Sequence, residues 1–547
     1  MIEKIRYVFS ESRSGENVPS IVLPSGNTLS LHSTVDPKRE AQRLICSIAD
    51  DIGFLVFLGL GGGFAPQAAL EITDAYIVVI DFDKESAASL LGSGDFSKLL
   101  NSNRFSLLLD PSGEEINKTI TENYLPALYG GITTIPLRAR TEQSRTEFEN
   151  AVSVIQEAVE SVKNDYSVQS HFGIRWFSNI IRNVRNINGN SNAFFNEKKQ
   201  IQNAAIAAAG PSLDRQLTSL KDAKAKGHFI ISCDTALPVL LHNALVPDAV
   251  VSIDCQHISY YHFIGCDLKN IPLILDIASP PSFYTLSQSP VFFISGHPLA
   301  KYINSVWRNF IQLDTSGGNV THACLSLVEN SGARNITFYG ADFAYINSQT
   351  YAKGAYIYPY FEQRQNRLSP AEKHASALLY RSPFLSPDNT RQNHHAENNQ
   401  YYETSSLRFY RKKLEEKIQS IDAEITFAKG YGAPVKERSS GGARSADGTT
   451  GEASSGTKNH LYNLRRNSAD GKINGAEFLE QYRDDIAALP EGEGNYLKKL
   501  NIKEKQIFTT LLPFAAAVKK RNHELKQKDL IEEVKKQCIE KINQVLN

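Results

Sequence analysis

The chain has 547 residues, more than one hydrophobic core usually organises, so its length predicts two or three domains. Hydrophobic residues at 41% and charged residues at 22% are ordinary values for a globular protein. The 59 Lys and Arg residues balance 59 Asp and Glu residues, which excludes a protein that binds nucleic acid through a net positive charge.

The start of the chain and its cysteines indicate a compartment. The sequence MIEKIRYVFSESRSGENV lacks the pattern of a signal peptide, and no apolar run approaches the length of a membrane span. The six cysteines are scattered without CxxC spacing, which is typical of reduced thiols. We therefore expect a cytoplasmic protein without membrane insertion.

Residues 1–165 alternate short apolar strands with helical patterns, which predicts an N-terminal Rossmann-like α/β domain. Its clearest βαβ unit reads FLVFLGLGGGFAPQAALEI and then AYIVVIDFD. Phe64 stands where the last small residue of a dinucleotide-binding turn belongs, so we expect the glycines to be structural. Asp81 and Asp83 form a DxD pattern far in sequence from the later strand-end signals, and we predict no metal site.

Residues 166–420 begin with an amphipathic helix and continue as apolar strands separated by helical stretches. Strands that are apolar throughout are typical of a parallel sheet covered on both faces, so we predict a central α/β domain with a mostly parallel sheet. The candidate strands are NAAIAAAG, HFIISCD, DAVVSID, PLILDIA, PVFFISG and NITFYGADF.

Residues 421–547 form the predicted C-terminal region. Segment 435–459 has almost no apolar residues, which indicates a flexible linker. The remainder reads as three short helices and ends in LIEEVKKQCIEKINQVL. We therefore expect a helical C-terminal region that follows a linker.

A strand that ends in Gly210, Pro211 and Ser212 runs directly into a helical pattern. The start of a helix leaves backbone N–H groups without partners and so favours an anion such as a phosphate. A tight, capped corner without any ligand explains the same pattern equally well.

Polar residues recur where successive predicted strands end. Open α/β sheets bind ligands at the carboxyl ends of their strands, so this recurrence favours the ligand site over the bare corner. The residues in question are Asp234, Thr235, Asp254, His297, Gly317, Gly318, Asn319, His322 and Asp342.

Five motifs in this order carry a resemblance to a known family. They are AAGPSLD, CDTAL, PDAVVSID, SGGNVTHACLSLVENSGARNITFYGADFAY and YAKGAY. Together they resemble the motility-associated factor (Maf) family of flagellin glycosyltransferases. The central domain of that family is similar to bacterial CMP-sugar sialyltransferases and to 6-hydroxymethylpterin pyrophosphokinase MptE-like proteins.

The resemblance implies transfer of a nonulosonic acid, of the pseudaminic or legionaminic acid type, from a CMP donor to Ser or Thr of flagellin. Such a protein serves flagellum assembly and motility, with flagellin as partner and the CMP-sugar as donor substrate, and needs no tightly bound cofactor. Gly210, Pro211 and Ser212 would lie against the donor phosphate. The residues implied near the nucleotide or in the same cleft are Asp234, Thr235, Asp254, Gly317, Gly318 and Asn319.

The resemblance also implies how the reaction is catalysed. Tyr356 and Tyr358 would reach the leaving phosphate from a lid, although packing within a loop explains them equally well. Transfer to a hydroxyl needs a base, and His322 and His297 are the candidates, each with a structural role as the alternative. Asp342 is the third catalytic candidate.

Two other functions remain open. In a pterin pyrophosphokinase, the Gly-Pro-Ser corner would hold ATP phosphates, while Asp254 and Asp342 would bind magnesium. A flagellin-binding assembly factor without turnover would use the tail helices, whose last segment carries an apolar stripe.

Overall fold

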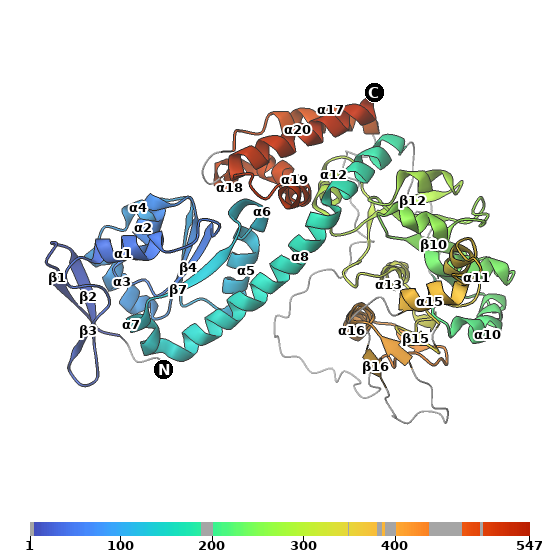
Figure 1. Ribbon diagram of the computed structural model, residues 1–547, viewed down its shortest axis with the longest axis horizontal. Helices are drawn as coiled ribbons and strands as arrows, with labels where there is room; N and C mark the ends of the chain where they lie inside the picture. The colour runs from blue at the N-terminus through green and yellow to red at the C-terminus, as the bar shows by residue number, and fades with distance from the viewer. Residues whose placement is uncertain are drawn as a thin grey trace. The chain divides into compact units, whose positions relative to one another are not determined.

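The computed structural model describes residues 5–187, 201–347, 349–379, 386–388, 401–436, 473–492 and 496–547 (Figure 1). The chain forms two compact units. The first comprises Met1–Ile174 with Arg483–Lys541, and the second comprises Arg175–Tyr482 with Ile542–Asn547. The predicted boundaries at 165 and 420 stay predictions, and the predicted linker lies outside the described residues from position 437 onward.

The first unit is built on a four-stranded parallel sheet in the order β6-β5-β4-β7. The two central strands are buried along their whole length, which explains their continuous apolar sequence. This arrangement confirms the expected Rossmann-like α/β domain. The strands are β4 (Phe54–Leu58), β5 (Tyr76–Asp81), β6 (Phe105–Leu109) and β7 (Ile132–Pro136).

Further elements complete the first unit. A small antiparallel sheet precedes the parallel one and consists of β1 (Tyr7–Glu11), β2 (Asn17–Val22) and β3 (Thr28–Ser30). The main helices of the N-terminal segment are α1 (Pro37–Cys46), α2 (Phe64–Ile72), α3 (Lys84–Ser93), α4 (Ser97–Leu100), α5 (Gly113–Asn123) and α6 (Pro126–Tyr129).

The glycine-rich turn after β4 is filled by side chains of the same unit. Nε2 of His32 accepts a hydrogen bond from the N–H of Gly62 at 2.8 Å. A Cβ atom at Gly61 would lie 2.5 Å from His32 and 2.6 Å from Leu137, and one at Gly59 would lie 2.9 Å from Arg140. Side chains of the same unit therefore pack closely against this turn, and its purely structural role stays a prediction.

The helical C-terminal region is confirmed. Its helices are α17 (Gly475–Ala487), α18 (Tyr496–Lys499), α19 (Ile502–Arg521) and α20 (Gln527–Leu546). Within the first unit, α19 contacts α6 and packs so closely on the long helix α8 (Arg145–Asn186) that a Cβ atom at Gly173 would lie 1.8 Å from the carbonyl oxygen of Pro513. No helix of the described ranges combines the length and apolarity needed to cross a membrane.

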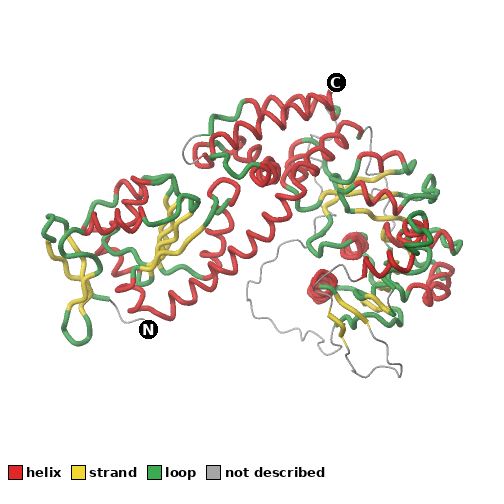
Figure 2. Tube along the Cα trace, in the orientation of Figure 1, coloured by secondary structure: helices red, strands yellow, loops and turns green. Residues whose placement is uncertain are grey.

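The second unit contains an eight-stranded sheet in the order β13-β12-β11-β10-β9-β8-β14-β18, and all of its strand pairs are parallel. This confirms the predicted parallel sheet, which the helices cover (Figure 2). Its strands are β8 (Asn203–Ala207), β9 (Phe229–Cys233), β10 (Ala249–Ser252), β11 (Leu273–Asp276), β12 (Pro290–Ile294), β13 (Ile311–Gln312), β14 (Asn335–Tyr339) and β18 (Glu424–Phe427).

The order of the strands reverses beside β8. From β8 the chain builds the sheet in one direction as far as β13, and it then returns to place β14 on the other side of β8. Helix α10 (Leu213–Ala225) contacts β8 and β14, whereas α13 (Val320–Asn330) contacts β8, β9 and β10. Because parallel crossovers are right-handed, the two helices cover opposite faces of the sheet.

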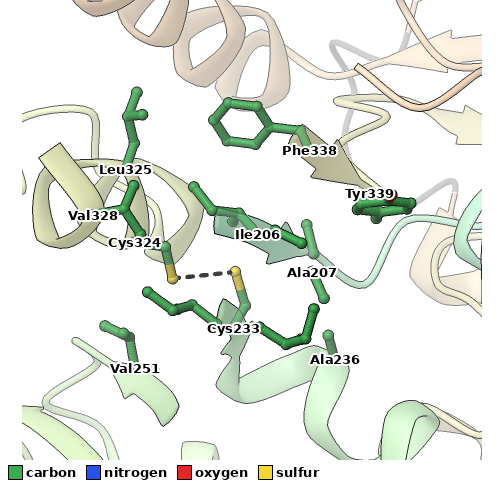
Figure 3. Close-up of a cluster of buried hydrophobic side chains, with 14 of the residues drawn as sticks. Ile206, Ala207, Cys233, Ala236, Val251, Cys324, Leu325, Val328, Phe338 and Tyr339 are labelled. Carbon is green, nitrogen blue, oxygen red and sulfur yellow. Dashed lines mark hydrogen bonds between the residues drawn. The ribbon is translucent and has the colours of Figure 1, made fainter. Parts of the chain in front are cut away.

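The core of the second unit lies between α13 and the central strands. Ile206, Cys233, Cys324 and Phe338 are each at most 2% exposed (Figure 3). The sulfur atoms of Cys233 and Cys324 are 3.9 Å apart, and all six cysteines of the chain are free thiols. This core fixes the ends of β8, β9 and β14, where the candidate site lies.

Smaller elements border this sheet. A three-stranded sheet in the order β15-β17-β16 consists of β15 (Tyr345–Ile346), β16 (Ser386–Asp388) and β17 (Tyr401–Glu403). The accompanying helices are α11 (Leu237–His242), α12 (Pro298–Val306), α14 (Ile357–Glu362), α15 (Ala371–Leu379) and α16 (Ser405–Ser420).

Candidate active site

The Gly210–Ser212 corner lies between β8 and α10, at the point where the strand order reverses. The backbone N–H of Ser212 donates to Oδ2 of Asp342 at 2.8 Å, and the two residues are 3% and 5% exposed. A Cβ atom at Gly210 would lie 2.4 Å from the same carboxylate oxygen. The anion that a helix start favours is therefore supplied within the chain, by Asp342.

The loop after β18 covers the same corner. Oγ of Ser212 accepts a hydrogen bond from the N–H of Tyr431 at 3.0 Å. Gln216 accepts from the N–H of Gly340 at 2.7 Å and donates to the carbonyl oxygens of Ala428 and Lys429 at 3.1 and 3.0 Å. This arrangement differs from the expectation that Ser212 faces a phosphate, because residues far along the chain use its N–H and hydroxyl groups. Burial raises the pKa of Asp342, and hydrogen bonds from Ser212 oppose that rise.

A second cluster lies at the carboxyl ends of β9 and β10. Asp234 is 1% exposed; its carboxylate accepts hydrogen bonds from the N–H of Thr235 and the hydroxyl of Ser252, each at 2.7 Å. Nδ1 of His262 lies 3.2 Å from Oδ2 of Asp234. His262 ends a short 3₁₀ helix, η3 (His257–His262), and its ring centroid is 4.4 Å from that of Tyr356.

Asp254 follows the neighbouring strand β10 and accepts a hydrogen bond from the N–H of Gln256 at 2.9 Å. Burial raises the pKa of Asp254, and the nearby carboxylate of Asp234 adds to this effect. Burial likewise raises the pKa of Tyr410, and the nearby carboxylate of Asp254 raises it further. Tyr410 packs on the turn after β13, since a Cβ atom at Gly318 would lie 3.0 Å from its ring. The structure thus brings Asp234, Asp254 and Gly318 toward one region.

The tyrosine-rich segment packs on this cluster. The ring centroids of Tyr351 and Tyr356 are 5.7 Å apart, and burial raises the pKa of Tyr351 far above its usual range. The hydroxyl of Tyr358 donates to the carbonyl oxygen of Tyr351 at 2.8 Å. Tyr356 therefore contacts the cluster through His262, whereas Tyr358 holds the segment together.

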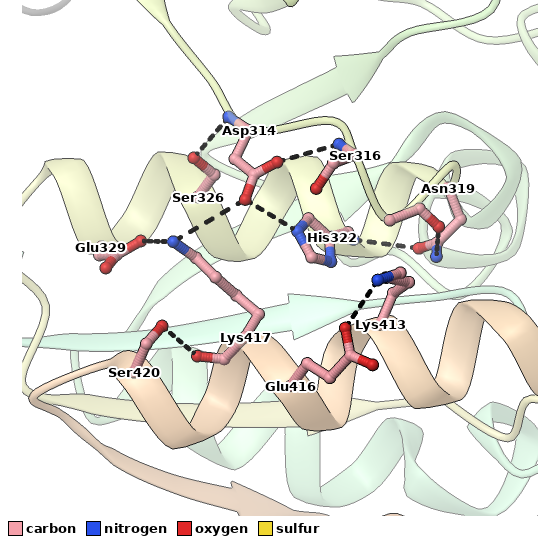
Figure 4. Close-up of polar contacts among 11 residues, drawn as sticks. Asp314, Ser316, Asn319, His322, Ser326, Glu329, Lys413, Glu416, Lys417 and Ser420 are labelled. Atoms are coloured by element: carbon pink, nitrogen blue, oxygen red, sulfur yellow. Dashed lines mark hydrogen bonds and ion pairs between the residues drawn. The ribbon is translucent and has the colours of Figure 1, made fainter. Parts of the chain in front are cut away.

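His322 belongs to a different network. It is 2% exposed, and its Nε2 lies 3.3 Å from Oδ2 of Asp314, which is 4.0 Å from Nζ of Lys417 (Figure 4). Asn319 caps α13 by accepting the N–H of His322 at 3.0 Å. The hydrogen bond to His322 is the main cause that lowers the pKa of Asp314. A Cβ atom at Gly317 would lie 2.3 Å from the His322 ring, so the backbone of this turn packs directly against the histidine.

His297 follows β12. It caps α12, with Nδ1 accepting the N–H of Leu299 at 3.2 Å, and burial lowers its pKa to about 3. Its strand, β12, is separated from β9 by β10 and β11, a distance of about 14 Å at the usual strand spacing. His297 thus caps α12 and His322 pairs with Asp314, whereas the histidine beside Asp234 is His262. Catalytic roles for His297 and His322 stay predictions.

Two asparagines of α8 hold the neighbouring strand ends, and sequence reasoning missed them. Nδ2 of Asn179 donates to the carbonyl oxygens of Cys255 and Ala278 at 3.0 and 2.8 Å. Nδ2 of Asn183 donates to those of Ile277 and Ser279, each at 2.8 Å. The one available signal was their spacing of four residues, which places both on one helix face.

His262 was missed as well, although CQHISYYHF follows Asp254 directly and is rich in ring side chains. A short 3₁₀ turn has no periodicity that would assign a residue to its buried face. In the described part of the chain, no three His, Cys, Asp or Glu side chains converge in a way that could hold a metal ion.

Residues 178–348 match the family described as 6-hydroxymethylpterin diphosphokinase MptE-like. An uncharacterized protein of Treponema pallidum (strain Nichols) is 30% identical over 162 residues, which are 28% of this chain and 76% of that protein. A second uncharacterized protein of the same organism is 36% identical over 126 residues, which are 22% of this chain and 44% of that protein, less than half of its length.

One solved structure is similar over the whole chain. It is the MAf glycosyltransferase from Magnetospirillum magneticum AMB-1, with a TM-score of 0.53, 14% sequence identity, and coverage of 100% of this chain and 91% of that one. At this identity the likeness establishes the fold. It covers both compact units and agrees with the layout of a Rossmann-like domain, a central parallel sheet and a helical C-terminal region.

Proposed function

The chain belongs to the MptE-like family, which its residues 178–348 match, and has the fold of the Maf glycosyltransferase; from this premise we propose that it is a glycosyltransferase. Its donor is a CMP-activated nonulosonic acid of the pseudaminic or legionaminic acid type, and its acceptor is a Ser or Thr hydroxyl of flagellin in the cytoplasm.

The observation that carries this proposal is the cluster of Asp234, His262 and Asp254 at the carboxyl ends of two adjacent parallel strands. Open α/β sheets bind their ligands at this edge, beside the point where the strand order reverses. The cluster combines a histidine whose Nδ1 lies 3.2 Å from a buried carboxylate oxygen, a half-buried second carboxylate and a tyrosine ring in contact with the histidine. These groups suit proton transfer at a sugar centre.

The proposed reaction exchanges one C–O bond for another and transfers one proton. The acceptor oxygen bonds to the anomeric carbon while the bond from that carbon to the phosphate oxygen breaks, and CMP leaves with the electron pair. His262 takes the hydroxyl proton, and the carboxylate of Asp234 stabilises the imidazolium that results. The phenol of Tyr356, whose ring contacts His262, donates a hydrogen bond to the leaving phosphate.

In this mechanism the Gly210–Ser212 corner has a structural role and does not bind the donor phosphate. The Asp342 carboxylate already accepts the N–H of Ser212, so a phosphate there would have to displace it. Tyr410 of α16 instead lies near Asp254 and packs on Gly318 in the turn after β13. The ring of Tyr356 contacts His262, the proposed proton acceptor.

The test is transfer by the full chain to purified flagellin, with CMP-pseudaminic acid and CMP-legionaminic acid as donors. We expect CMP release and a flagellin mass increase of one sugar with one of them. His262→Ala should lower kcat by about 100-fold or more, the usual contribution of a positioned base. His257→Ala, on the exposed face of the same turn, is the matched control and should leave the rate unchanged. An unmodified flagellin with both donors, and no CMP release, would contradict the proposal.

A second candidate function is ATP-dependent diphosphotransfer to 6-hydroxymethylpterin, which the description of the matching family favours. That reaction would need Asp254 and Asp342 on one magnesium ion. Their strands, β10 and β14, are separated by β9 and β8, about 14 Å at the usual spacing, and Asp342 is bound to Ser212. Formation of AMP and pterin diphosphate by the wild type would favour this candidate.

A further inference from the structure

The two buried asparagines of α8 differ in which loops they hold, although each donates from Nδ2 to two backbone carbonyl oxygens. Asn183 donates to two carbonyl oxygens of a single loop, the one that follows β11. Asn179 donates to Ala278 of that loop at 2.8 Å and also to Cys255, in the loop after β10, at 3.0 Å. Asn179 therefore joins two loops, one of which begins near Asp254.

One peptide group connects Asn179 to the Asp254 carboxylate. The carbonyl oxygen of Cys255 and the N–H of Gln256 belong to the same peptide group. Its oxygen accepts from Asn179 at 3.0 Å, and its N–H donates to Oδ1 of Asp254 at 2.9 Å. Because a peptide group is planar and rigid, its C=O and N–H bonds turn together. The amide of Asn179 thus sets the direction in which the Gln256 N–H holds the carboxylate.

We propose that Asn179 is a positioning residue, which orients the Asp254 carboxylate in the candidate active site through the peptide group between Cys255 and Gln256. The proposal rests on the proposed function, in which Asp254 belongs to the strand-end cluster, and deepens it by giving α8 a part in that site. Asn179 acts through the backbone, so its effect depends on the peptide group that it holds.

The Asp254 carboxylate needs such a support because its surroundings oppose its negative charge. Burial raises the pKa of Asp254, the hydrogen bond from Gln256 lowers it, and the nearby carboxylate of Asp234 raises it. Without the Gln256 N–H, repulsion between the two carboxylates would favour protonation of Asp254 or rotation of its side chain. A misplacement of about 1 Å in an active site can lower a rate by about 100-fold, so a small shift of the peptide group is sufficient.

The experiment compares Asn179→Ala with the matched control Asn183→Ala in the full chain. Each variant loses two hydrogen bonds from a buried amide group, so urea unfolding followed by tryptophan fluorescence should show similar losses of stability. Amide hydrogen exchange at Gln256 should be about ten-fold faster in Asn179→Ala than in Asn183→Ala, the effect of one weakened hydrogen bond. The kcat for transfer to flagellin should fall by about ten-fold or more in Asn179→Ala and by less than about two-fold in Asn183→Ala.

The outcomes separate this inference from the proposed function. Equal exchange at Gln256 in the two variants, or an equal fall of kcat in both, would overturn the positioning role. Faster exchange in Asn179→Ala with a wild-type kcat would also overturn it, while leaving the glycosyltransferase proposal intact. If the wild type releases no CMP, the proposed function fails, and exchange at Gln256 still decides whether Asn179 holds the Asp254 contact. Should Asn179→Ala not fold, Asn179→Leu, which keeps the volume of the side chain, takes its place in each comparison.

Discussion

The carboxylate of Asp342 accepts the backbone N–H of Ser212 at 2.8 Å, although 130 residues separate the two in the chain. Ser212 is the N-cap residue of α10, and Asp342 follows β14, the strand placed beside β8 after the sheet reverses its order. The contact joins the two loops that diverge at this point. It also fills with a protein carboxylate the position where a helix start would otherwise attract a free anion.

The first prediction concerns this contact. Asp342→Ala leaves the buried N–H of Ser212 without its acceptor, so the free energy of unfolding of the second unit should fall by about 1–3 kcal/mol. Both tryptophans, Trp176 and Trp307, lie in this unit, so tryptophan fluorescence in urea measures its unfolding. Asp222→Ala, on the exposed side of α10, should change stability by less than about 0.5 kcal/mol. Superimposable curves for the two variants would refute the bridging role of Asp342.

The second prediction concerns the turn above His322. An alanine Cβ atom at Gly317 would lie 2.3 Å from the His322 ring, so Gly317→Ala must displace the ring or the turn. We expect a loss of about 1–3 kcal/mol, typical of overpacking. Gly296→Ala is the matched control, because a Cβ atom there meets no heavy atom within 4 Å. Urea unfolding followed by tryptophan fluorescence measures both, and a Gly317→Ala protein as stable as Gly296→Ala would contradict the packing.

The parallel sheet was predictable because its strands are short apolar runs with polar residues at their ends. Asp234 and Asp254 lie near one another for the same reason, since adjacent parallel strands end at one edge. Strand β18 was not predictable: Glu424–Phe427 alternates exposed and half-buried residues, and it pairs with β14, far earlier in the chain. The contacts of Ser212 with Asp342 and Tyr431 depend on such distant pairings. The inward position of His262 depends on a short 3₁₀ helix, which has no periodic pattern in the sequence.

The third prediction is a pH dependence from Asp276, at the end of β11. Burial raises the pKa of Asp276 to about 6, although a hydrogen bond from the N–H of Ala278 acts to lower it. The folded state therefore binds more protons than the unfolded state between about pH 4 and pH 6, and stability from this group falls as pH rises through that window. A shift of about two pKa units corresponds to about 3 kcal/mol.

The variant Asp276→Asn removes this titration. Urea unfolding at pH 4, 5, 6 and 7 should show the wild type losing stability relative to the variant as the pH rises, with no further relative change above about pH 7. Parallel stabilities of the two proteins across all four values would exclude a raised pKa for Asp276.

The fourth prediction separates structural from catalytic histidines. His297 accepts the N–H of Leu299 as the cap of α12, and an asparagine side chain can accept the same bond. His297→Asn should therefore keep both stability and transfer, whereas His297→Ala should lose about 1 kcal/mol as a lost cap. Measuring kcat and urea unfolding for both variants distinguishes a capping role of His297 from a catalytic one. A loss of kcat in His297→Asn with unchanged stability would place His297 in the reaction.

The last prediction concerns the first unit, where Nη2 of Arg140 and Oδ1 of Asp81 are 2.7 Å apart and the side chains are 0% and 1% exposed. The other carboxylate oxygen of Asp81 accepts the N–H of Leu60 at 2.6 Å, so the first acid of the DxD pattern is fully engaged within the protein. Asp81→Asn leaves the guanidinium buried without its counter-charge and should cost about 3–5 kcal/mol. The double variant Asp81→Asn/Arg140→Met removes the stranded charge and should recover a large part of that loss. Because the tryptophans lie in the other unit, amide hydrogen exchange in β4 and β5 is the measurement. Exchange in the double variant as fast as in Asp81→Asn would show that the uncompensated charge is not the cause of the instability.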